Sequence, residues 1–136
     1  MVVYLSVIFF LYLLEEQKMR LSDSEWKIAD CLWTKGDMTI TELTKELRPV
    51  TGWGKNTIIT LLKRMTEKGA ITFVQEDKAK RFHPVVDRTE AELEETASFL
   101  DKVYNGNVGL MISNLIDSDQ LTDEQLAELR RIIKEG

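Results

Sequence analysis

Residues 57–68 read TIITLLKRMTEK, and Gly69 follows them, ahead of two β-rich runs, ITFVQED (71–77) and KRFHPVV (80–86). Apolar residues recur in this stretch at i, i+3, i+4 and i+7, the spacing of a helix that packs on a core by one face. They are Ile58, Leu61, Leu62 and Met65. Gly54 precedes the expected start, and Gly69 suits the left-handed residue that follows a helix end. An amphipathic helix followed by a hairpin predicts a winged helix-turn-helix.

Two shorter helices are expected before this one. Ser22 and Glu25 form a capping box, a hydroxyl followed three residues later by a carboxylate, and the helix that it opens should stop near Gly36. Thr39 with Glu42 repeats the pattern. The second helix should end at or just after residue 48, because a proline follows at residue 49.

Polar and basic side chains occupy the rest of the main helix and the turn before it. Amide and hydroxyl groups can bind base edges in the major groove of DNA, and basic groups can bind phosphates. An ordinary surface helix with solvated charges is the alternative. The predicted DNA contacts in this region are Trp53, Lys55, Asn56, Thr57, Ile59, Thr60, Lys63 and Arg64.

The hairpin has a polar expected tip, DKAK at residues 77–80. Lys78, Lys80 and Arg81 could lie along a phosphate backbone or in a minor groove. Glu76 and Asp77 partly cancel their charge, so a solvated turn is the alternative.

Charge divides the chain. Its 136 residues carry a net charge of −5, but residues 20–86 hold 12 Lys and Arg against 9 Asp and Glu, whereas residues 87–136 hold 5 against 12. Phosphate binding responds to the local field rather than to net charge. We therefore expect a winged-helix DNA-binding domain at 20–86 and a separate helical domain at 87–136.

The second region reads as three short amphipathic helices, which hold more apolar surface than they can bury among themselves. A homodimer would bury that surface and would place two winged helices on two half-sites. The alternative is that the helices fold back on their own winged helix. The expected dimer contacts are Leu93, Ala97, Leu100, Tyr104, Leu126, Leu129 and Ile133.

From Leu21 to Lys134 the chain resembles the penicillinase-repressor family of bacterial transcriptional regulators. The resemblance is carried by LSDSEWKIADCLW (21–33), by the run from Trp53 to Gly69, by ASFLDKVYNG (97–106) and by LTDEQLAELRRII (121–133). It implies a mostly helical protein with a small β-hairpin, in which a winged helix-turn-helix precedes a helical dimerisation domain. It also implies a homodimeric repressor on palindromic, double-stranded operator DNA.

The family's DNA-facing residues often read Lys-Thr-x-Arg-Thr, and the matching residues 56–60 read Asn-Thr-Ile-Ile-Thr. Asn56 and Ile59 thus replace two basic residues. We expect a changed sequence preference, with affinity depending more on Lys55, Lys63 and Arg64.

The resemblance also bears on how repression is relieved. Copper-responsive members have a Cys-rich tail, but the tail LRRIIKEG (129–136) contains no cysteine. The chain has one Cys and one His, which are too few for a metal site. No metal or cofactor is therefore expected. Members that respond to β-lactams are cut in the C-terminal domain, and the matching bond is Asn114-Leu115. That reading implies a membrane-bound sensor protease, or a protease that it activates, as a partner. The alternative is that Leu115 and its apolar neighbours only pack in the dimer core.

No nucleophile motif, pair of catalytic acids or phosphate-binding loop is visible, so the sequence predicts neither an enzyme nor a small-molecule substrate. Cys31 reads as a buried small apolar residue, and a lone cysteine suits a reducing cytoplasm. The rival function is a winged-helix protein-interaction module with little DNA affinity.

Residues 2–14 are apolar apart from Ser6, but they are too few for a membrane-spanning helix, which needs about 20 residues. Because the family resemblance begins after Met19, we expect residues 1–19 to lie outside the native domain, with Met19 as the natural start. A membrane-associating segment is the alternative.

Overall fold

The computed structural model describes residue 7 and residues 20–136. It divides the chain into two compact units, with the boundary between Glu92 and Leu93. The units are described separately below. The expectations for residues 1–19 fall outside the described residues, apart from residue 7. Among the residues that the structure describes, none of the helices has the length and apolar character needed to cross a membrane.

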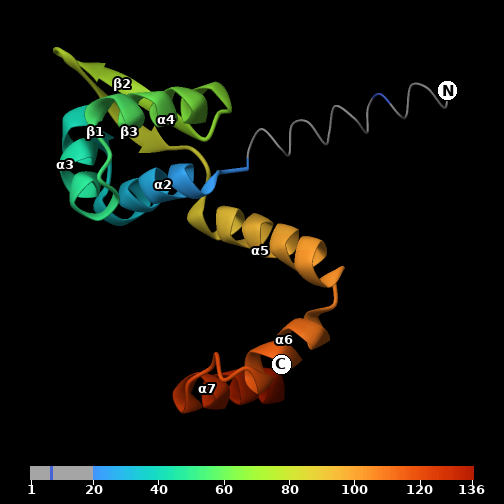
Figure 1. The fold of residues 1–136 in the computed structure, drawn as a ribbon. Helices are drawn as coiled ribbons and strands as arrows, with labels where there is room; N and C mark the ends of the chain where they lie inside the picture. Colours follow the sequence, from blue (N-terminus) through green and yellow to red (C-terminus); the bar gives the residue numbers. More distant parts are fainter. Residues whose placement is uncertain (1–6, 8–19) are drawn as a thin grey trace. The chain divides into compact units, whose positions relative to one another are not determined.

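The first unit is a winged helix-turn-helix, as the sequence predicts (Figure 1). Three helices precede or flank a three-stranded antiparallel sheet of order β1-β3-β2. The elements, in chain order, are α2 (Asp23–Lys35), β1 (Met38–Thr39), α3 (Ile40–Thr51), α4 (Lys55–Glu67), β2 (Ile71–Glu76) and β3 (Ala79–Pro84).

The capping signals of the first helix are confirmed. The Ser22 hydroxyl accepts the Glu25 backbone N–H, and the Glu25 carboxylate accepts the Ser22 N–H at 2.8 Å. α2 ends at Lys35, and Gly36 follows with φ of 92°, a conformation that a residue with a Cβ rarely adopts.

The predicted end of α3 was wrong, because the helix continues through Pro49 to Thr51. Proline removes only one hydrogen bond so close to a helix end. Buried Leu47 anchors this last turn, and its carbonyl accepts the Thr51 hydroxyl at 2.7 Å. Gly52, with φ of 75°, donates to the Arg48 carbonyl and closes the helix.

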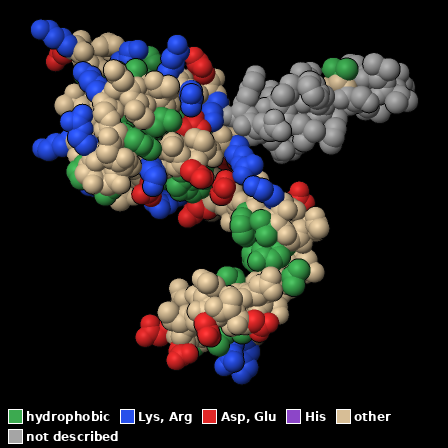
Figure 2. Space-filling model, in the orientation of Figure 1, with side chains coloured by type: hydrophobic (Ala, Val, Ile, Leu, Met, Phe, Trp, Pro, Cys, Tyr) green, Lys and Arg blue, Asp and Glu red, His purple; other side chains and the backbone are tan. Residues whose placement is uncertain are grey.

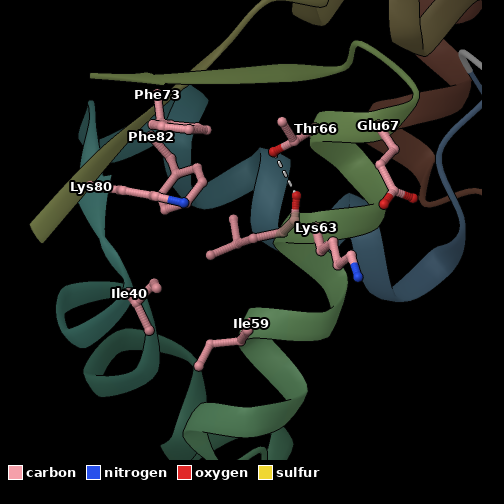
Figure 3. Close-up of a pocket in the computed structure, with 9 residues that line it drawn as sticks. Ile40, Ile59, Lys63, Thr66, Glu67, Phe73, Lys80 and Phe82 are labelled. Atoms are coloured by element: carbon pink, nitrogen blue, oxygen red, sulfur yellow. Dashed lines mark hydrogen bonds between the residues drawn. The ribbon is translucent and has the colours of Figure 1, made fainter. Parts of the chain in front are cut away.

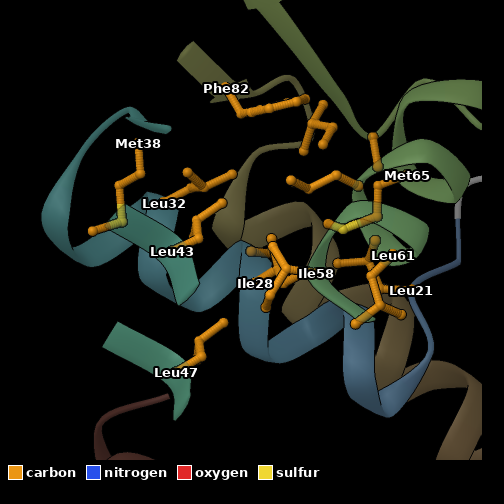
Figure 4. Close-up of a cluster of buried hydrophobic side chains, with 14 residues drawn as sticks. Leu21, Ile28, Leu32, Met38, Leu43, Leu47, Ile58, Leu61, Met65 and Phe82 are labelled. Carbon is orange, nitrogen blue, oxygen red and sulfur yellow. The ribbon is translucent and has the colours of Figure 1, made fainter. Parts of the chain in front are cut away.

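The core of the first unit lies between the three helices and the sheet (Figure 4). Ile28, Leu43 and Ile58 contribute fully buried side chains from α2, α3 and α4. Phe82 adds a buried ring from the central strand. The predicted apolar stripe of α4 is therefore the face that packs inward.

The sheet differs in two respects from the prediction. Only Asp77 and Lys78 form the turn, whereas Ala79 and Lys80 lie in β3 and were wrongly placed in the tip. The short strand β1 was not predicted. It pairs Met38 with Phe82 across the sheet, and this pairing depends on chain segments far apart in the sequence.

α5 (Arg88–Tyr104) begins in the first unit. The Arg88 guanidinium binds Asp30 of α2 at 3.0 Å, and its Cζ atom lies 5.6 Å from the centre of the Trp33 ring. The Trp33 indole N–H donates to the Val86 carbonyl at 3.0 Å, and Ala91 is buried. These contacts fix the first turn of α5.

The second unit holds the rest of α5, α6 (Val108–Asp117) and α7 (Asp123–Glu135). Asn107 caps α6, and Thr122 with Gln125 forms the capping box that the sequence predicts for the last helix. Neither α6 nor α7 has a buried residue. Several large apolar side chains of this unit are exposed, among them Leu93, Val108 and Ile132.

Candidate nucleic-acid interface

α4 presents one buried and one exposed face. Its apolar stripe is at most 6% exposed, whereas Lys55, Asn56, Thr57, Thr60, Lys63 and Arg64 are all exposed. Ile59 joins them with 39% of its surface exposed. The structure thus brings the predicted helix contacts, except Trp53, together on the solvent side of one helix.

The start of α4 favours an anion. Gly54 is the N-cap and supplies no side-chain cap, so the first backbone N–H groups point outward without a side-chain acceptor. No acidic residue lies in the first turn, and Lys55 adds a positive charge there. Helix N-termini of this kind bind phosphate through backbone N–H groups and the helix dipole.

Trp53 has a structural role in addition to any contact with DNA. Its side chain is half-buried and packs against the core. Its backbone N–H donates to the Thr51 hydroxyl at 3.1 Å, and its carbonyl accepts the Arg48 guanidinium at 3.4 Å. Trp53 thereby holds the turn between α3 and α4.

Two basic residues of α3 lie beside the predicted contacts and were missed from the sequence. Lys45 and Arg48, one helical turn apart, line a groove of about 570 Å³ together with Lys55. The i, i+3 spacing of two cations on the helix before the turn was the available signal. Figure 2 shows Lys and Arg side chains projecting at several points of the first unit.

The hairpin offers two lysines. Lys78 is exposed at the tip, and the Lys80 ammonium lies 4.4 Å from the centre of the Phe73 ring. Both line a second groove, of about 370 Å³, with Lys55 of α4. The hairpin and the start of α4 therefore place three cations around one hollow.

Arg81, a predicted DNA contact, is engaged by other residues of the protein. Its guanidinium pairs with Glu76 at 2.9 Å and with Glu42 of α3 at 3.3 Å, and donates to the Asp37 carbonyl. The hydrogen bond that Arg81 donates to Glu76 raises the pKa of Arg81 above its ordinary value, and attraction to Glu76 and Glu42 adds to this effect. These contacts make Arg81 a link between the sheet and α3.

The exposed polar side chains of α4 differ in their availability. The Thr60 hydroxyl donates to the Asn56 carbonyl at 3.0 Å and is partly occupied. Within the part of the chain that the structure describes, no hydrogen bond or ion pair engages the side chains of Asn56, Lys63 or Arg64. These three side chains are therefore available to bind a ligand.

The far end of α4 is held by a buried ion pair. The Lys68 ammonium donates to the Glu25 carboxylate of α2 at 2.7 Å and to the Arg20 carbonyl at 2.9 Å. Burial alone would raise the pKa of Glu25, but the hydrogen bonds from Lys68 and Ser22 outweigh it and lower the pKa. The pair orients α4 against α2.

An apolar groove lies between α4 and the hairpin (Figure 3). It measures about 310 Å³ and is lined by Ile40, Ile59, Leu62, Phe73 and Phe82. Lys63, Glu67 and Lys80 stand at its edges.

Cys31 and His83 do not form a site. Cys31 is half-buried, and burial together with the charge of Asp30 raises the pKa of its thiol. His83 Nδ1 lies 2.7 Å from an Asp37 carboxylate oxygen on the surface. No group of three metal-ligating side chains occurs among the described residues.

The predicted cleavage bond lies inside α6. Asn114 is exposed and Leu115 is half-buried, and the Asn114 carbonyl accepts hydrogen bonds from the Ser118 backbone and hydroxyl. A protease needs an extended substrate, so cleavage there would require α6 to unwind locally.

A family model described as penicillinase repressor matches residues 21–135. The chain belongs to the penicillinase-repressor family. Among its relatives, a penicillinase repressor of Bacillus licheniformis is 31% identical over 116 residues, covering 85% of this chain and 91% of that protein. The methicillin resistance regulatory protein MecI of Mammaliicoccus sciuri is 23% identical over 120 residues, covering 88% and 98%.

A solved structure of the penicillinase-repressor family also matches the chain. It is the solution structure of monomeric Bacillus licheniformis BlaI in complex with the blaP half-operator, which is 28% identical with a TM-score of 0.47, covering 52% of this chain and 87% of that one.

Proposed function

We propose that the protein is a transcriptional repressor that binds palindromic, double-stranded operator DNA as a homodimer in the cytoplasm. The observation that carries this proposal is the exposed face of α4, along which the side chains of Asn56, Lys63 and Arg64 are unengaged, on a helix whose first turn has no acidic residue. Base-edge groups and phosphate-binding groups on one helix are the combination that a recognition helix needs. Membership of a family whose relatives are named repressors supports the same function.

The phosphate contacts that we propose come from three elements. α3 contributes Lys45 and Arg48, α4 contributes Lys55, Lys63 and Arg64, and the hairpin contributes Lys78 and Lys80. Cations on both sides of the recognition helix would fix its register along the duplex. We leave Arg81 out of this set because its charge is balanced by Glu42 and Glu76.

The second unit is proposed to form the dimer. None of its residues, 93–136, is buried, so none of its apolar side chains is fully covered within one chain. A second copy would cover the exposed apolar side chains and would place two recognition helices on a dyad. Proteolysis at Asn114-Leu115 by a sensor-controlled protease in response to an antibiotic signal would then release the operator by separating α7 from the rest of the dimer domain.

The test is fluorescence anisotropy of a labelled duplex, chosen by selection from a random pool, with the full chain at several salt concentrations. We expect selective binding of two chains per duplex, with an affinity that falls steeply as salt rises. The variant Lys63→Ala/Arg64→Ala should reduce the slope of log affinity against log salt by about 1 for each phosphate that the variant no longer neutralises.

A matched control removes two charges elsewhere. Lys27→Ala/Lys134→Ala lowers the net charge equally, and both side chains are exposed outside α4 and the hairpin. This variant should keep the wild-type slope. Equal slopes for both variants, or binding without any salt dependence, would contradict the proposal and favour a protein-interaction module.

A further inference from the structure

Ile59 is an exposed apolar residue on an otherwise polar surface. It is 39% exposed on the solvent face of α4, one helical turn from Asn56 and from Lys63. It does not stand alone, because Ile40 and Phe73 line the same groove as Ile59 (Figure 3). A grouped apolar surface beside a proposed binding site indicates that its partner also has an apolar group there.

The charges around the groove limit what that partner can be. Lys63 and Lys80 stand at its edges against one carboxylate, that of Glu67. The rim therefore favours an anionic partner that carries small apolar groups. A DNA duplex meets both conditions, since its major groove exposes the C5-methyl group of thymine between two phosphate backbones.

We propose that Ile59 and Asn56 together read neighbouring A·T base pairs, with Ile59 contacting a thymine methyl and the Asn56 amide binding the N6 and N7 atoms of an adenine. Residues three apart on a helix have Cβ atoms about 5–6 Å apart. Successive base pairs are stacked at about 3.4 Å, so the two side chains can reach adjacent pairs. This inference rests on the proposed function and specifies which bases the recognition helix selects.

The experiment changes single methyl groups on the DNA, so it does not depend on how a variant folds. Each thymine of the selected duplex is replaced in turn by deoxyuridine, which lacks only the methyl group, and the affinity of the full chain is measured by anisotropy. We expect about fourfold weaker binding at one thymine of each half-site, the effect of one buried methyl group, and no change at the others.

Three variants test which residue is responsible for each effect. Ile59→Ala should bind the thymine and deoxyuridine duplexes equally, because the side chain that meets the methyl is gone. Lys63→Ala should weaken both duplexes by the same factor and should keep the difference between them. Asn56→Ala should relax the choice of base at the neighbouring pair only.

The outcomes separate this inference from the proposed function. A selective, salt-dependent complex that is indifferent to every deoxyuridine replacement would overturn the inference and leave the repressor intact, as would selection of G·C pairs at the two positions. The absence of any selective duplex at low salt would overturn both.

Discussion

The replacement Lys68→Met tests whether the ion pair between α2 and α4 holds the recognition helix in place. Glu25 is only 2% exposed, and the side chain of Lys68 is 20% exposed. Methionine keeps the length of the side chain but leaves the Glu25 charge buried without its partner. Such a loss costs about 3–5 kcal/mol in a dry interior. Because water reaches the lysine side, we expect a loss of about 2–3 kcal/mol in the free energy of unfolding.

The assay can follow the first unit alone. The three tryptophans of the chain, Trp26, Trp33 and Trp53, all lie in that unit. Urea unfolding followed by tryptophan fluorescence therefore reports its stability without a signal from α6 or α7. Thermal unfolding can be followed by the same fluorescence. For a domain of this size each kcal/mol of lost stability lowers the Tm by about 4–8 °C, so the Tm should fall by roughly 10–20 °C.

A double variant tests whether the loss of stability comes from the unpaired charge of Glu25. Glu25→Gln keeps a carbonyl oxygen for the Ser22 N–H and removes the buried charge. Glu25→Gln/Lys68→Met should therefore be more stable than Lys68→Met alone. As a control, Lys35→Met breaks the exposed pair with Glu46 and should leave the urea midpoint almost unchanged.

Acid provides an independent check. Because the folded pKa of Glu25 lies below its ordinary value of 4.5, the pair stabilises the fold fully above that pH and loses this effect as the pH falls through the folded pKa. The difference in the free energy of unfolding between wild type and Lys68→Met should therefore narrow as the pH falls below 4.5. A change of less than about 0.5 kcal/mol at pH 7, within the range of ordinary surface substitutions, would refute the reasoning.

Three further predictions concern other parts of the chain. Ile58→Ala, at a fully buried position of α4, should lower the free energy of unfolding by about 2–5 kcal/mol in the same fluorescence assay, and a loss below about 1 kcal/mol would mean that the stripe is not the core face. Leu129→Glu places a charge on the apolar side of α7 and should shift the proposed dimer to a monomer in sedimentation, with weaker binding to the proposed operator; a dimer that persists in this variant would remove α7 from the proposed interface. Cys31 should react slowly with a thiol reagent at pH 8, because burial raises its pKa above 9.0, and should react much faster in urea; equal rates would show an exposed thiol.

The helices of this fold were predictable because their signals are local. The Ser22 and Thr122 capping boxes each satisfy backbone groups within four residues, and the stripe of α4 needs only its own sequence. The sheet was less predictable. β1 is two residues long and exists because Met38 meets Phe82, a pairing that no local pattern of residues 38 and 39 reveals.

The site was predictable in its residue types but not in their partners. Lys63 and Arg81 look alike in the sequence, yet only Arg81 lies within reach of two carboxylates in the folded chain. The end of α3 was predicted wrongly because the local tendency of Pro49 to end a helix was overridden by the packing of Leu47. Which cations are free and where a helix stops were both decided by tertiary contacts.

The junction at Thr39 sets where this chain can change length. Thr39 is the last residue of β1 and also the N-cap of α3, so no spare residue separates the sheet from the helix. An insertion there would move the cap and break the pairing with Arg81 at once. The turn residues Asp77 and Lys78 are both exposed, and neither caps a helix, although Lys78 is a proposed phosphate contact. Hairpins of different length can therefore be grafted at the tip, whereas the step from β1 into α3 admits none.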